Sequence, residues 1–517
     1  MMRLKIPKLS FCTAGVTFLL ISAVSWNRSV TESHPNLLIV YPDQMRAQAM
    51  GFMKQDPVIT PTLDALSKSS LVLTNAVANY PVCSPSRAML MTGKYPFSNH
   101  VTYNCVSDAA HFEIELKESE RCWSDVLRDE GYELGYIGKW HLDAPRRPFV
   151  KCRNNYTDFA WNEWCPPHRR HGFSFWYAYG TYDYHNQPMY WDTDAGRDDF
   201  HLVDEWGPVH EADMAIRYIQ NENGMLRDPG KPFALVVAMN PPHDGMKDYE
   251  EVPQNYVDLY DGFTYKDLIN RPNVVLEGGR YSGFAREQTK NYFAMVSGVD
   301  EQFGRILEAL SEKGLDSNTI VLFLSDHGNC MGNHEHHGKG IYYEESMRIP
   351  FLIRWPGKIE ARFDDLLISV PDIYPTLLEL MGFGEKIPAG VEGESHASIF
   401  LTGEGERPSS QFYLWTPQLI NPALGMRGIR TNRYTLAIDR SYTDRYNCCL
   451  YDNRNDPYQL NNIASENPDI VRQLIEQEMD PWLEKTGDPW SLTWPCENSA
   501  DRLFLNDENL SNTGYDY

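Results

Sequence analysis

Residues 285–328 read AREQTKNYFAMVSGVDEQFGRILEALSEKGLDSNTIVLFLSDHG, and this stretch contains two strong structural signals. Apolar residues recur at steps of three and four over residues 285–313, which predicts an amphipathic helix. Residues 319–324 form a short continuous apolar run that is typical of a buried strand. Asp326 and His327 follow this strand directly. A helix that leads into a buried strand is one repeat of an α/β fold.

The same alternation extends along most of the chain. Residues 36–41, 71–77, 132–137, 233–238 and 349–354 are further strand candidates, and residues 122–130 and 372–381 are further helix candidates. This order predicts an α/β domain over residues 34–400, with a mostly parallel sheet sandwiched by helices.

The pattern changes after residue 401. Short strand-like runs lie at 411–415, 425–429 and 434–438, and an amphipathic helix is predicted over 469–484. We therefore expect a smaller C-terminal α+β subdomain over residues 401–517.

The composition limits the partners of the chain. It has 517 residues and a formal net charge of −24, which makes nucleic acid an unsuitable ligand. Arg3, Lys5 and Lys8 precede an uncharged apolar stretch, and small residues follow it, so residues 1–25 are predicted to be a signal peptide. We expect a secreted or periplasmic protein without a stable membrane span after cleavage. The alternative is an uncleaved signal anchor.

The chain has ten cysteines. Cys12 lies in the predicted signal peptide, and Cys83 lies in a motif described below. Eight others remain, an even number that fits disulfide bonding in an exported protein. Two pairs are close enough in sequence to form local bridges, Cys105 with Cys122 and Cys152 with Cys165. The alternative is a set of reduced, buried thiols.

Reactive side chains follow several of the predicted strands. Asp43, Lys139, His243 and Asp326 each lie just beyond the end of a strand candidate, and Cys83 follows the second strand. In open α/β sheets, ligands bind outside the carboxyl ends of the parallel strands. The sequence therefore predicts one site at that edge of the sheet.

The sharpest motif is the segment 83–93, Cys-Ser-Pro-Ser-Arg-Ala-Met-Leu-Met-Thr-Gly. It resembles the signature of the formylglycine-dependent (type I) sulfatases, Cys-x-Pro-x-Arg followed by Thr-Gly, and the resemblance runs from about residue 35 to 489. It implies the fold of the alkaline phosphatase superfamily. It also implies that Cys83 is oxidised to formylglycine (3-oxoalanine) by a formylglycine-generating or anaerobic sulfatase-maturating enzyme. The hydrated aldehyde would then act as the nucleophile.

The resemblance also implies a calcium site. Asp43 and Asp326 would supply the hard oxygen ligands that Ca²⁺ prefers, beside the modified Cys83. Gln44 stands where the family usually has a second aspartate, so it can ligate only through a neutral oxygen. His327 stands where many relatives have asparagine, and we expect it to contact the metal, the sulfate or the nucleophile.

Five further residues would act on the substrate or the nucleophile. In the family pattern, Lys139 and Lys339 hold sulfate oxygens, and His141 contacts the nucleophile. His243 would protonate or polarise the leaving oxygen, and Arg87 would position the nucleophile. These cations would form a local positive pocket in an acidic protein.

The substrate is suggested by the aromatic-rich stretch 173–191, expected to be a long excursion over the sheet edge. Asp183 and His185 lie within it, and aromatic rings beside polar groups suit sugar rings. The stretch resembles segments of sulfatases that act on polysaccharides of marine algae, so we expect a sulfated carbohydrate substrate. Two alternatives remain open: a formylglycine-dependent phosphodiester or phosphonate monoester hydrolase, and a non-catalytic binding protein of the same fold.

Overall fold

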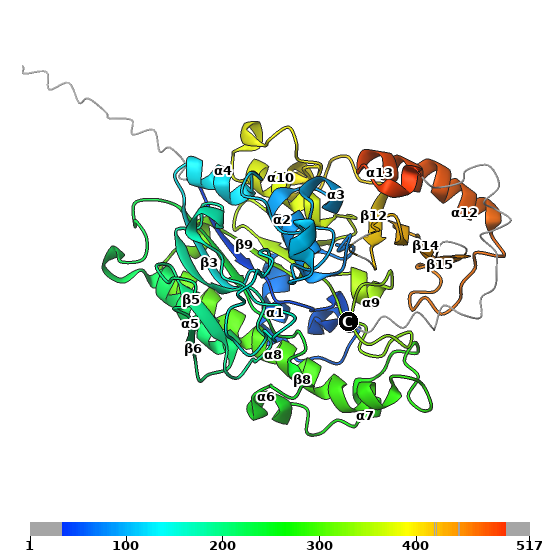
Figure 1. Ribbon diagram of the computed structural model, residues 1–517, viewed down its shortest axis with the longest axis horizontal. Coiled ribbons are helices and arrows are strands. Elements are labelled where there is room, and N and C mark those ends of the chain that lie inside the picture. The colour runs from blue at the N-terminus through cyan, green and yellow to red at the C-terminus, as the bar shows by residue number, and fades with distance from the viewer. Residues whose placement is uncertain (1–33, 418, 420, 443–444, 493–517) are drawn as a thin grey trace, which may run out of the picture. The chain divides into compact units, whose positions relative to one another are not determined.

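The computed structural model describes residues 34–492, apart from 418, 420, 443 and 444. Its main feature is one large sheet (Figure 1). In spatial order its strands are β11 (Arg362–Asp364), β2 (Leu71–Leu73), β10 (Phe351–Arg354), β9 (Thr319–Leu324), β1 (Asn36–Val40), β7 (Phe233–Ala238), β3 (Glu133–Lys139), β4 (Phe175–Tyr179), β5 (Met189–Asp192) and β6 (His201–Leu202). The centre, from β9 through β4, is parallel, which confirms the predicted fold class.

Helices cover both faces of this sheet. The α-helices are α1 (Pro61–Leu66), α2 (Cys83–Thr92), α3 (Pro96–Asn99), α4 (Trp123–Asp129), α5 (Gly207–Gln220), α6 (Gln254–Asp258), α7 (Tyr265–Leu268), α8 (Ser282–Glu312), α9 (Glu344–Met347), α10 (Val370–Leu380), α11 (Ala397–Thr402), α12 (Pro468–Leu474) and α13 (Asp480–Lys485). The helix predicted over 285–313 is observed as the α-helix α8, whose bounds differ slightly from the predicted ones. The described residues also form short 3₁₀ turns, a short strand β8 (Met246–Tyr249) and a π-helical turn over 475–479.

Each central strand contributes to two hydrophobic cores, because alternate side chains point to opposite faces. In β1, Leu37 and Ile39 pack with residues of α2, α4 and α10, whereas Leu38 and Val40 pack with residues of α1, α5 and α8. Figure 1 shows α2, α4 and α10 on one side of β3, and α5 and α8 on the other. The sheet is thus covered on both faces, as expected for parallel strands.

One local expectation was wrong. Residues 173–191 do not form a plain excursion, because β4 and most of β5 lie within them and extend the sheet. Trp176 and Ala178 face one core, whereas Tyr177 and Tyr179 face the other. Because both faces are buried, the sequence shows no alternation of apolar and polar residues here. The strand β10 runs antiparallel to β9, and no long crossover helix lies between the two strands.

A second, antiparallel sheet follows in the C-terminal part, as predicted. Its strands, in spatial order, are β12 (Ser410–Trp415), β13 (Gly425–Thr431), β14 (Tyr434–Tyr442) and β15 (Arg445–Asp452). The strand β15 was not predicted from the sequence. Buried residues of this sheet belong to the same core as α2, α4 and α10. The predicted boundary at residues 400/401 falls inside α11 and stays a prediction.

The predicted disulfides are not formed. In the described part of the chain Cys105, Cys122, Cys152 and Cys165 are free thiols, three of them fully buried or nearly so. Each sulfur has its own surroundings: Cys152 accepts a hydrogen bond from Asn162 at 3.7 Å, and Cys165 donates to the Pro166 carbonyl oxygen at 3.9 Å. Closeness in sequence therefore did not bring these sulfurs together.

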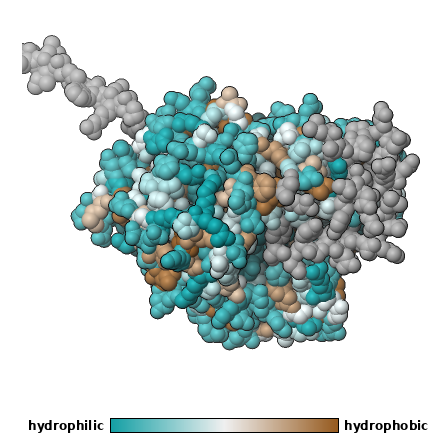
Figure 2. Space-filling view, viewed as in Figure 1, coloured by the Kyte–Doolittle hydropathy of each residue, from teal (hydrophilic) through white to brown (hydrophobic). Residues whose placement is uncertain are grey.

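The predicted signal peptide, residues 1–25, lies outside the described residues. Among the helices that the structure describes, none combines the length and the apolar character needed to cross a membrane. The face in Figure 2 is largely hydrophilic, with hydrophobic residues in small scattered groups. This surface agrees with the high charge of the sequence.

Candidate active site

Four neighbouring parallel strands carry the predicted site residues to one edge of the sheet. Asp326 follows β9, Asp43 follows β1, His243 follows β7, and Lys139 is the last residue of β3. These four strands are consecutive in the order β9-β1-β7-β3. The loops beyond their carboxyl ends therefore converge, as the topology requires.

Cys83 is the first residue of α2 and faces this convergence point. Only 2% of it is exposed. Its Sγ lies 3.2 Å from Lys339 Nζ, 3.4 Å from His327 Nε2 and 3.9 Å from Lys139 Nζ. Burial and the Asp43 carboxylate act to raise the pKa of this thiol, but the nearby cations outweigh them and hold it well below its ordinary value. The helix N-terminus adds a further positive end.

Arg87 lies one turn further along α2 and links the two aspartates. Its Nη2 is 3.0 Å from Asp43 Oδ2 and 3.0 Å from Asp326 Oδ2, and its Nη1 donates to the Lys139 carbonyl oxygen at 2.7 Å. All of these groups are buried. Arg87 thus offsets part of the charge of two carboxylates held together away from water, and Lys139 Nζ, at 2.7 Å from Asp43 Oδ2, supplies a second cation.

A group of possible metal ligands surrounds the cysteine. One ligand atom each from Asp43, Cys83, Asp326 and His327 lies within 4.8 Å of the others. The two carboxylates are fully buried and turn one oxygen each toward Arg87, which fixes their orientation. Hard carboxylate oxygens in a charged, buried group fit a Ca²⁺ ion.

Lys139 is held by a chain of polar contacts. Its Nζ lies 2.7 Å from Asp43 Oδ2 and donates to Asn240 Oδ1 at 3.0 Å. Asn240 in turn donates to Asp183 Oδ1 at 3.1 Å, and Asn154 donates to Asp183 Oδ2 at 3.0 Å. Asp183, predicted to bind substrate, therefore also anchors the amide that orients Lys139.

Lys339 joins the remaining predicted residues. Its Nζ lies 2.8 Å from His243 Nε2 and 2.8 Å from Gln44 Oε1. His243 Nδ1 is 2.6 Å from the Asp244 carbonyl oxygen, so Nδ1–H donates there and Nε2 accepts from Lys339. Gln44 Nε2 donates to Asp244 Oδ1 at 3.0 Å. The side-chain oxygen of Gln44 thus contacts a lysine at the edge of the ligand group.

The two other predicted histidines have different places. His141 is buried beside Cys83, and neither of its ring nitrogens has a hydrogen-bond partner of ordinary geometry in the described part of the chain. Burial lowers its pKa, which leaves it neutral and able to bond a bound group. His185 does not line the cavity. Burial lowers its pKa to about 4, and its Nε2 lies 2.9 Å from the His243 carbonyl oxygen, so it supports the His243 loop from behind.

A cavity of about 300 Å³ opens onto Cys83. The predicted residues that line it are Gln44, Cys83, Lys139, His141, Asp183, His243 and Lys339. The sequence had not singled out the other lining residues, which include Tyr156, Trp161, Asp244, Met246 and His337. Most come from irregular loops, where no periodicity marks them. Two signals were present: Asp244 follows His243 directly, and His337 is two residues from Lys339.

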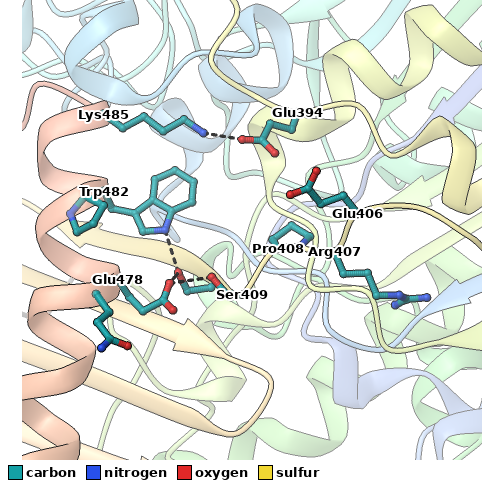
Figure 3. Close-up of a pocket in the computed structure, with 11 residues that line it drawn as sticks. Glu394, Glu406, Arg407, Pro408, Ser409, Glu478, Trp482 and Lys485 are labelled. Atoms are coloured by element: carbon teal, nitrogen blue, oxygen red, sulfur yellow. Dashed lines mark hydrogen bonds and ion pairs between the residues drawn. The ribbon is translucent and has the colours of Figure 1, made fainter.

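A second hollow of about 460 Å³ lies between β12 and α13 (Figure 3). Figure 3 shows Lys485 reaching Glu394, at 3.0 Å, with Trp482 beside them. Arg407 also lines it and pairs with Asp364 at 2.8 Å. Because both cations are already paired with carboxylates, this hollow offers no evident place for a sulfate.

Two family models match the chain. The sulfatase model matches residues 35–383, and the model for the C-terminal part of N-sulphoglucosamine sulphohydrolase matches residues 332–485. An endo-4-O-sulfatase of Bacteroides thetaiotaomicron is 42% identical over 88% of this chain and 93% of its own length. An ulvan-active sulfatase of Formosa agariphila is 33% identical over 91% of this chain and 85% of its own length.

A solved structure from work on the metabolism of multiple glycosaminoglycans by Bacteroides thetaiotaomicron also matches. It has a TM-score of 0.82 and 40% sequence identity, and the match covers 91% of this chain and 100% of that one. The fold and the charges around Cys83 define an ester hydrolase of the alkaline phosphatase superfamily. The chain belongs to the sulfatase family, and it is a sulfuric ester hydrolase.

Proposed function

We propose that this sulfatase removes sulfate from a sulfated glycan by means of a formylglycine made from Cys83. The observation that carries the proposal is the set of groups around the Cys83 sulfur. Lys139, Lys339 and His141 line one cavity with Cys83, and His327 and the buried aspartates Asp43 and Asp326 lie next to the sulfur. The names of the relatives support the substrate class, since one acts as an endo-4-O-sulfatase and another on ulvan.

Each cation around Cys83 has a distinct part in holding the substrate. Formylglycine, when formed, supplies a hydrated aldehyde with one hydroxyl for attack and a second for release of the sulfate. Lys139 and Lys339 approach the position of residue 83 from two sides, so they can hold two sulfate oxygens at once. Neutral His141 can donate a third hydrogen bond.

Calcium is the cofactor that fits this site. Asp43 and Asp326 would hold it, with His327 and the oxygen of residue 83 next to them. When bound, the ion would lower the pKa of the attacking hydroxyl and draw charge from the sulfate oxygens. Arg87 keeps both carboxylates aligned for this role.

His243 is placed to act on the leaving oxygen. Its Nε2 faces Lys339 inside the cavity, while its Nδ1–H is fixed by the Asp244 carbonyl. Burial and both lysines act to lower the pKa of His243, but the Asp244 and Asp43 carboxylates raise it to about 9, so His243 can itself carry a proton and pass it to the departing sugar oxygen. His185 holds the backbone of His243 in the required position.

The place of action and the activating partner also belong to this proposal. The predicted signal peptide supports a secreted or periplasmic enzyme. Formylglycine formation requires a formylglycine-generating or anaerobic sulfatase-maturating enzyme in the same host.

The test is made on protein produced together with a maturating enzyme. Mass spectrometry of the peptide containing Cys83 should show conversion of the thiol to an aldehyde. Sulfate release from chondroitin sulfate, ulvan and carrageenan fragments is then measured by ion chromatography, before and after removal of metal with EDTA and after addition of Ca²⁺. We expect release from at least one glycan, loss with EDTA and recovery with Ca²⁺.

The same protein decides between the proposal and its rival. An aryl sulfate and an aryl phosphate diester of the same phenol are compared at equal concentration. Faster turnover of the phosphate diester, with no sulfate released from any glycan, would overturn the proposal in favour of a phosphoesterase. Activity with an unmodified thiol at Cys83 would overturn the mechanism alone.

A further inference from the structure

We infer that Arg153 binds an anionic group, a carboxylate or a sulfate, on the sugar unit next to the one that loses its sulfate. This inference rests on the proposed function and defines its substrate class, a glycan that carries anionic groups on consecutive units. The cavity above Cys83 has a volume of about 300 Å³, at the small end of the range for ligand pockets. A polymeric substrate therefore leaves its neighbouring units at the rim of the cavity.

The loop that leads to this rim is basic, although the chain as a whole is acidic. Residues 144–157 contain three arginines, one lysine and no acidic residue, whereas the net charge of the chain is −24. Arg146 is paired with Glu115 at 2.7 Å. Lys151 and Arg153 are exposed, and neither forms an ion pair with a carboxylate among the residues that the structure describes. The loop therefore offers positive charge that a ligand can reach.

Arg153 lies beside two residues that line the cavity. Its guanidinium lies over the Tyr184 ring, 5.3 Å from the ring centroid. Tyr184 directly follows Asp183, and Tyr156 lies three residues after Arg153. Both Asp183 and Tyr156 line the cavity, and Tyr156 is 52% exposed. A guanidinium held over an aromatic face keeps a rigid fork of N–H groups, which matches a carboxylate or a sulfate.

Two asparagines fix the backbone on either side of this position. Asn154 is buried, and its Nδ2 donates to Asp183 Oδ2 at 3.0 Å. Asn155 Nδ2 donates to the Val150 carbonyl oxygen at 3.0 Å, and its Oδ1 accepts from the Trp161 N–H at 3.0 Å. The loop is thus held in place before any ligand arrives, which reduces the entropy lost on binding.

Two carboxylates share this region with Arg153. Glu251 and Asp183 both act electrostatically on Tyr184, as Arg153 does with the opposite sign. Glu251 Oε2 accepts from the His185 N–H at 2.5 Å, and Asp183 is held by two asparagine side chains. These carboxylates lower the net positive charge of the region, but they do not occupy the guanidinium by contact. The gain expected from one anionic group at Arg153 is therefore modest.

The first experiment measures binding without turnover. Protein produced without the maturating enzyme keeps the Cys83 thiol, and its affinity for a chondroitin 4-sulfate hexasaccharide is measured by isothermal titration calorimetry with Ca²⁺ present. We expect Arg153→Gln to weaken binding about fivefold.

The matched control is Lys313→Gln, which also removes one positive charge. Lys313 is an exposed residue at the end of α8, before the first residue of β9, and so lies toward the opposite edge of the sheet from the cavity. This control should change the affinity by less than about 1.5-fold.

The second experiment uses the modified enzyme and the same hexasaccharide. We expect Arg153→Gln to raise KM about fivefold and to leave kcat within about twofold, because Arg153 contacts a sugar unit that does not react. Arg153→Lys, which keeps the charge but not the fork, should recover part of the loss. The effect of NaCl on KM should be weaker in Arg153→Gln than in the native enzyme.

A carboxyl-reduced hexasaccharide identifies the anionic group. Its uronates are neutral, whereas its 4-sulfates remain. If the difference between the native protein and Arg153→Gln disappears with this ligand, Arg153 binds a carboxylate. If the difference persists, Arg153 binds the sulfate of a neighbouring unit. Either result supports the inferred site.

Three results would overturn the inference: no measurable binding of the hexasaccharide by the native protein, equal affinities of the native protein and Arg153→Gln, or equal losses in Arg153→Gln and Lys313→Gln. Absence of sulfate release from every glycan would instead contradict the proposed function. In that case the calorimetric data still decide whether Arg153 binds an anionic glycan.

Discussion

At the scale of single residues, Cys83 carries the proposed chemistry. A serine there would offer one hydroxyl, which could accept a sulfuryl group but could not expel it by forming an aldehyde. We expect Cys83→Ser to release at most about one sulfate per enzyme molecule and Cys83→Ala to release none. Sulfate is counted by ion chromatography against active enzyme. Steady-state turnover at the native rate by Cys83→Ser would refute the mechanism.

Arg87 is the residue whose loss should cost most stability. It stands between Asp43 and Asp326, and removing one partner of such a buried group leaves uncompensated charge. We expect Arg87→Met to lower the free energy of unfolding by about 3–5 kcal/mol in urea titrations with EDTA present. The matched control is Arg407→Met, because the pair of Arg407 with Asp364 is partly exposed. That control should lose less than about 1 kcal/mol. Equal losses in both variants would contradict the assigned role.

At the scale of elements, Glu211 of α5 makes a pH-dependent contact with β4 and β5. Its Oε1 accepts hydrogen bonds from Tyr179 at 3.1 Å and Tyr190 at 3.2 Å, and Oε2 has no partner in the described part of the chain. Burial is the main cause that raises the pKa of this carboxyl to about 8. The folded protein therefore holds a proton that the unfolded chain releases near pH 4.3.

The sign of the effect follows from proton binding. Between about pH 4.3 and 8 the folded state binds more protons at Glu211, so this group lowers stability as pH rises, and its effect levels off above pH 8. We expect the free energy of unfolding of Glu211→Gln to rise relative to that of the native protein as pH increases. The rise is at most about 1.4 kcal/mol per pH unit across this window. Urea unfolding at pH 5, 7 and 9 measures the difference. A difference that is constant with pH would contradict the assignment.

Much of the element order could be predicted from the sequence, because periodicity and strand-end residues are local signals. The helix α8 and the strands β1, β3, β7 and β9 were predicted close to their observed bounds. The strands β4 and β5 were missed because both of their faces are buried. The direction of β10 depends on how the chain returns in space, which no local pattern contains.

The residues of the candidate site likewise fall into those that local sequence signals indicated and those that only tertiary packing determines. Strand-end logic and the motif around Cys83 indicated the residues that the structure brings together near its sulfur. Asn240, which contacts Lys139, and the cavity-lining residues Tyr156 and Asp244 lie in loops, whose paths depend on tertiary packing. His185 shows the limit of sequence-based prediction. It was predicted to bind substrate, but it lies behind His243 rather than in the cavity.

At the scale of the whole molecule, the C-terminal sheet supports the cavity. Tyr413 of β12 donates from its hydroxyl to the Gly340 carbonyl oxygen at 3.0 Å, next to Lys339. We expect Tyr413→Phe to reduce kcat/KM on the best glycan while costing about 1 kcal/mol of stability. Tyr132→Phe is the control, because its hydroxyl donates to the Pro35 carbonyl at 2.8 Å, at the opposite end of β3 from Lys139. A similar loss of activity in both variants would show that the effect is general destabilisation.

The depth at which Cys83 lies sets an order of events in the life of the enzyme. Every residue of α2 is buried, and the cavity above Cys83 admits small groups but not the catalytic centre of another protein. On the proposed mechanism, a maturating enzyme would have to meet this segment while the chain is still extended, before folding closes over it. We expect folded, unmodified protein to resist conversion by the maturating enzyme, while a synthetic peptide spanning residues 79–96 is converted, as mass spectrometry would show. Folding would then compete in time with activation, and a chain that folds before conversion would remain inactive.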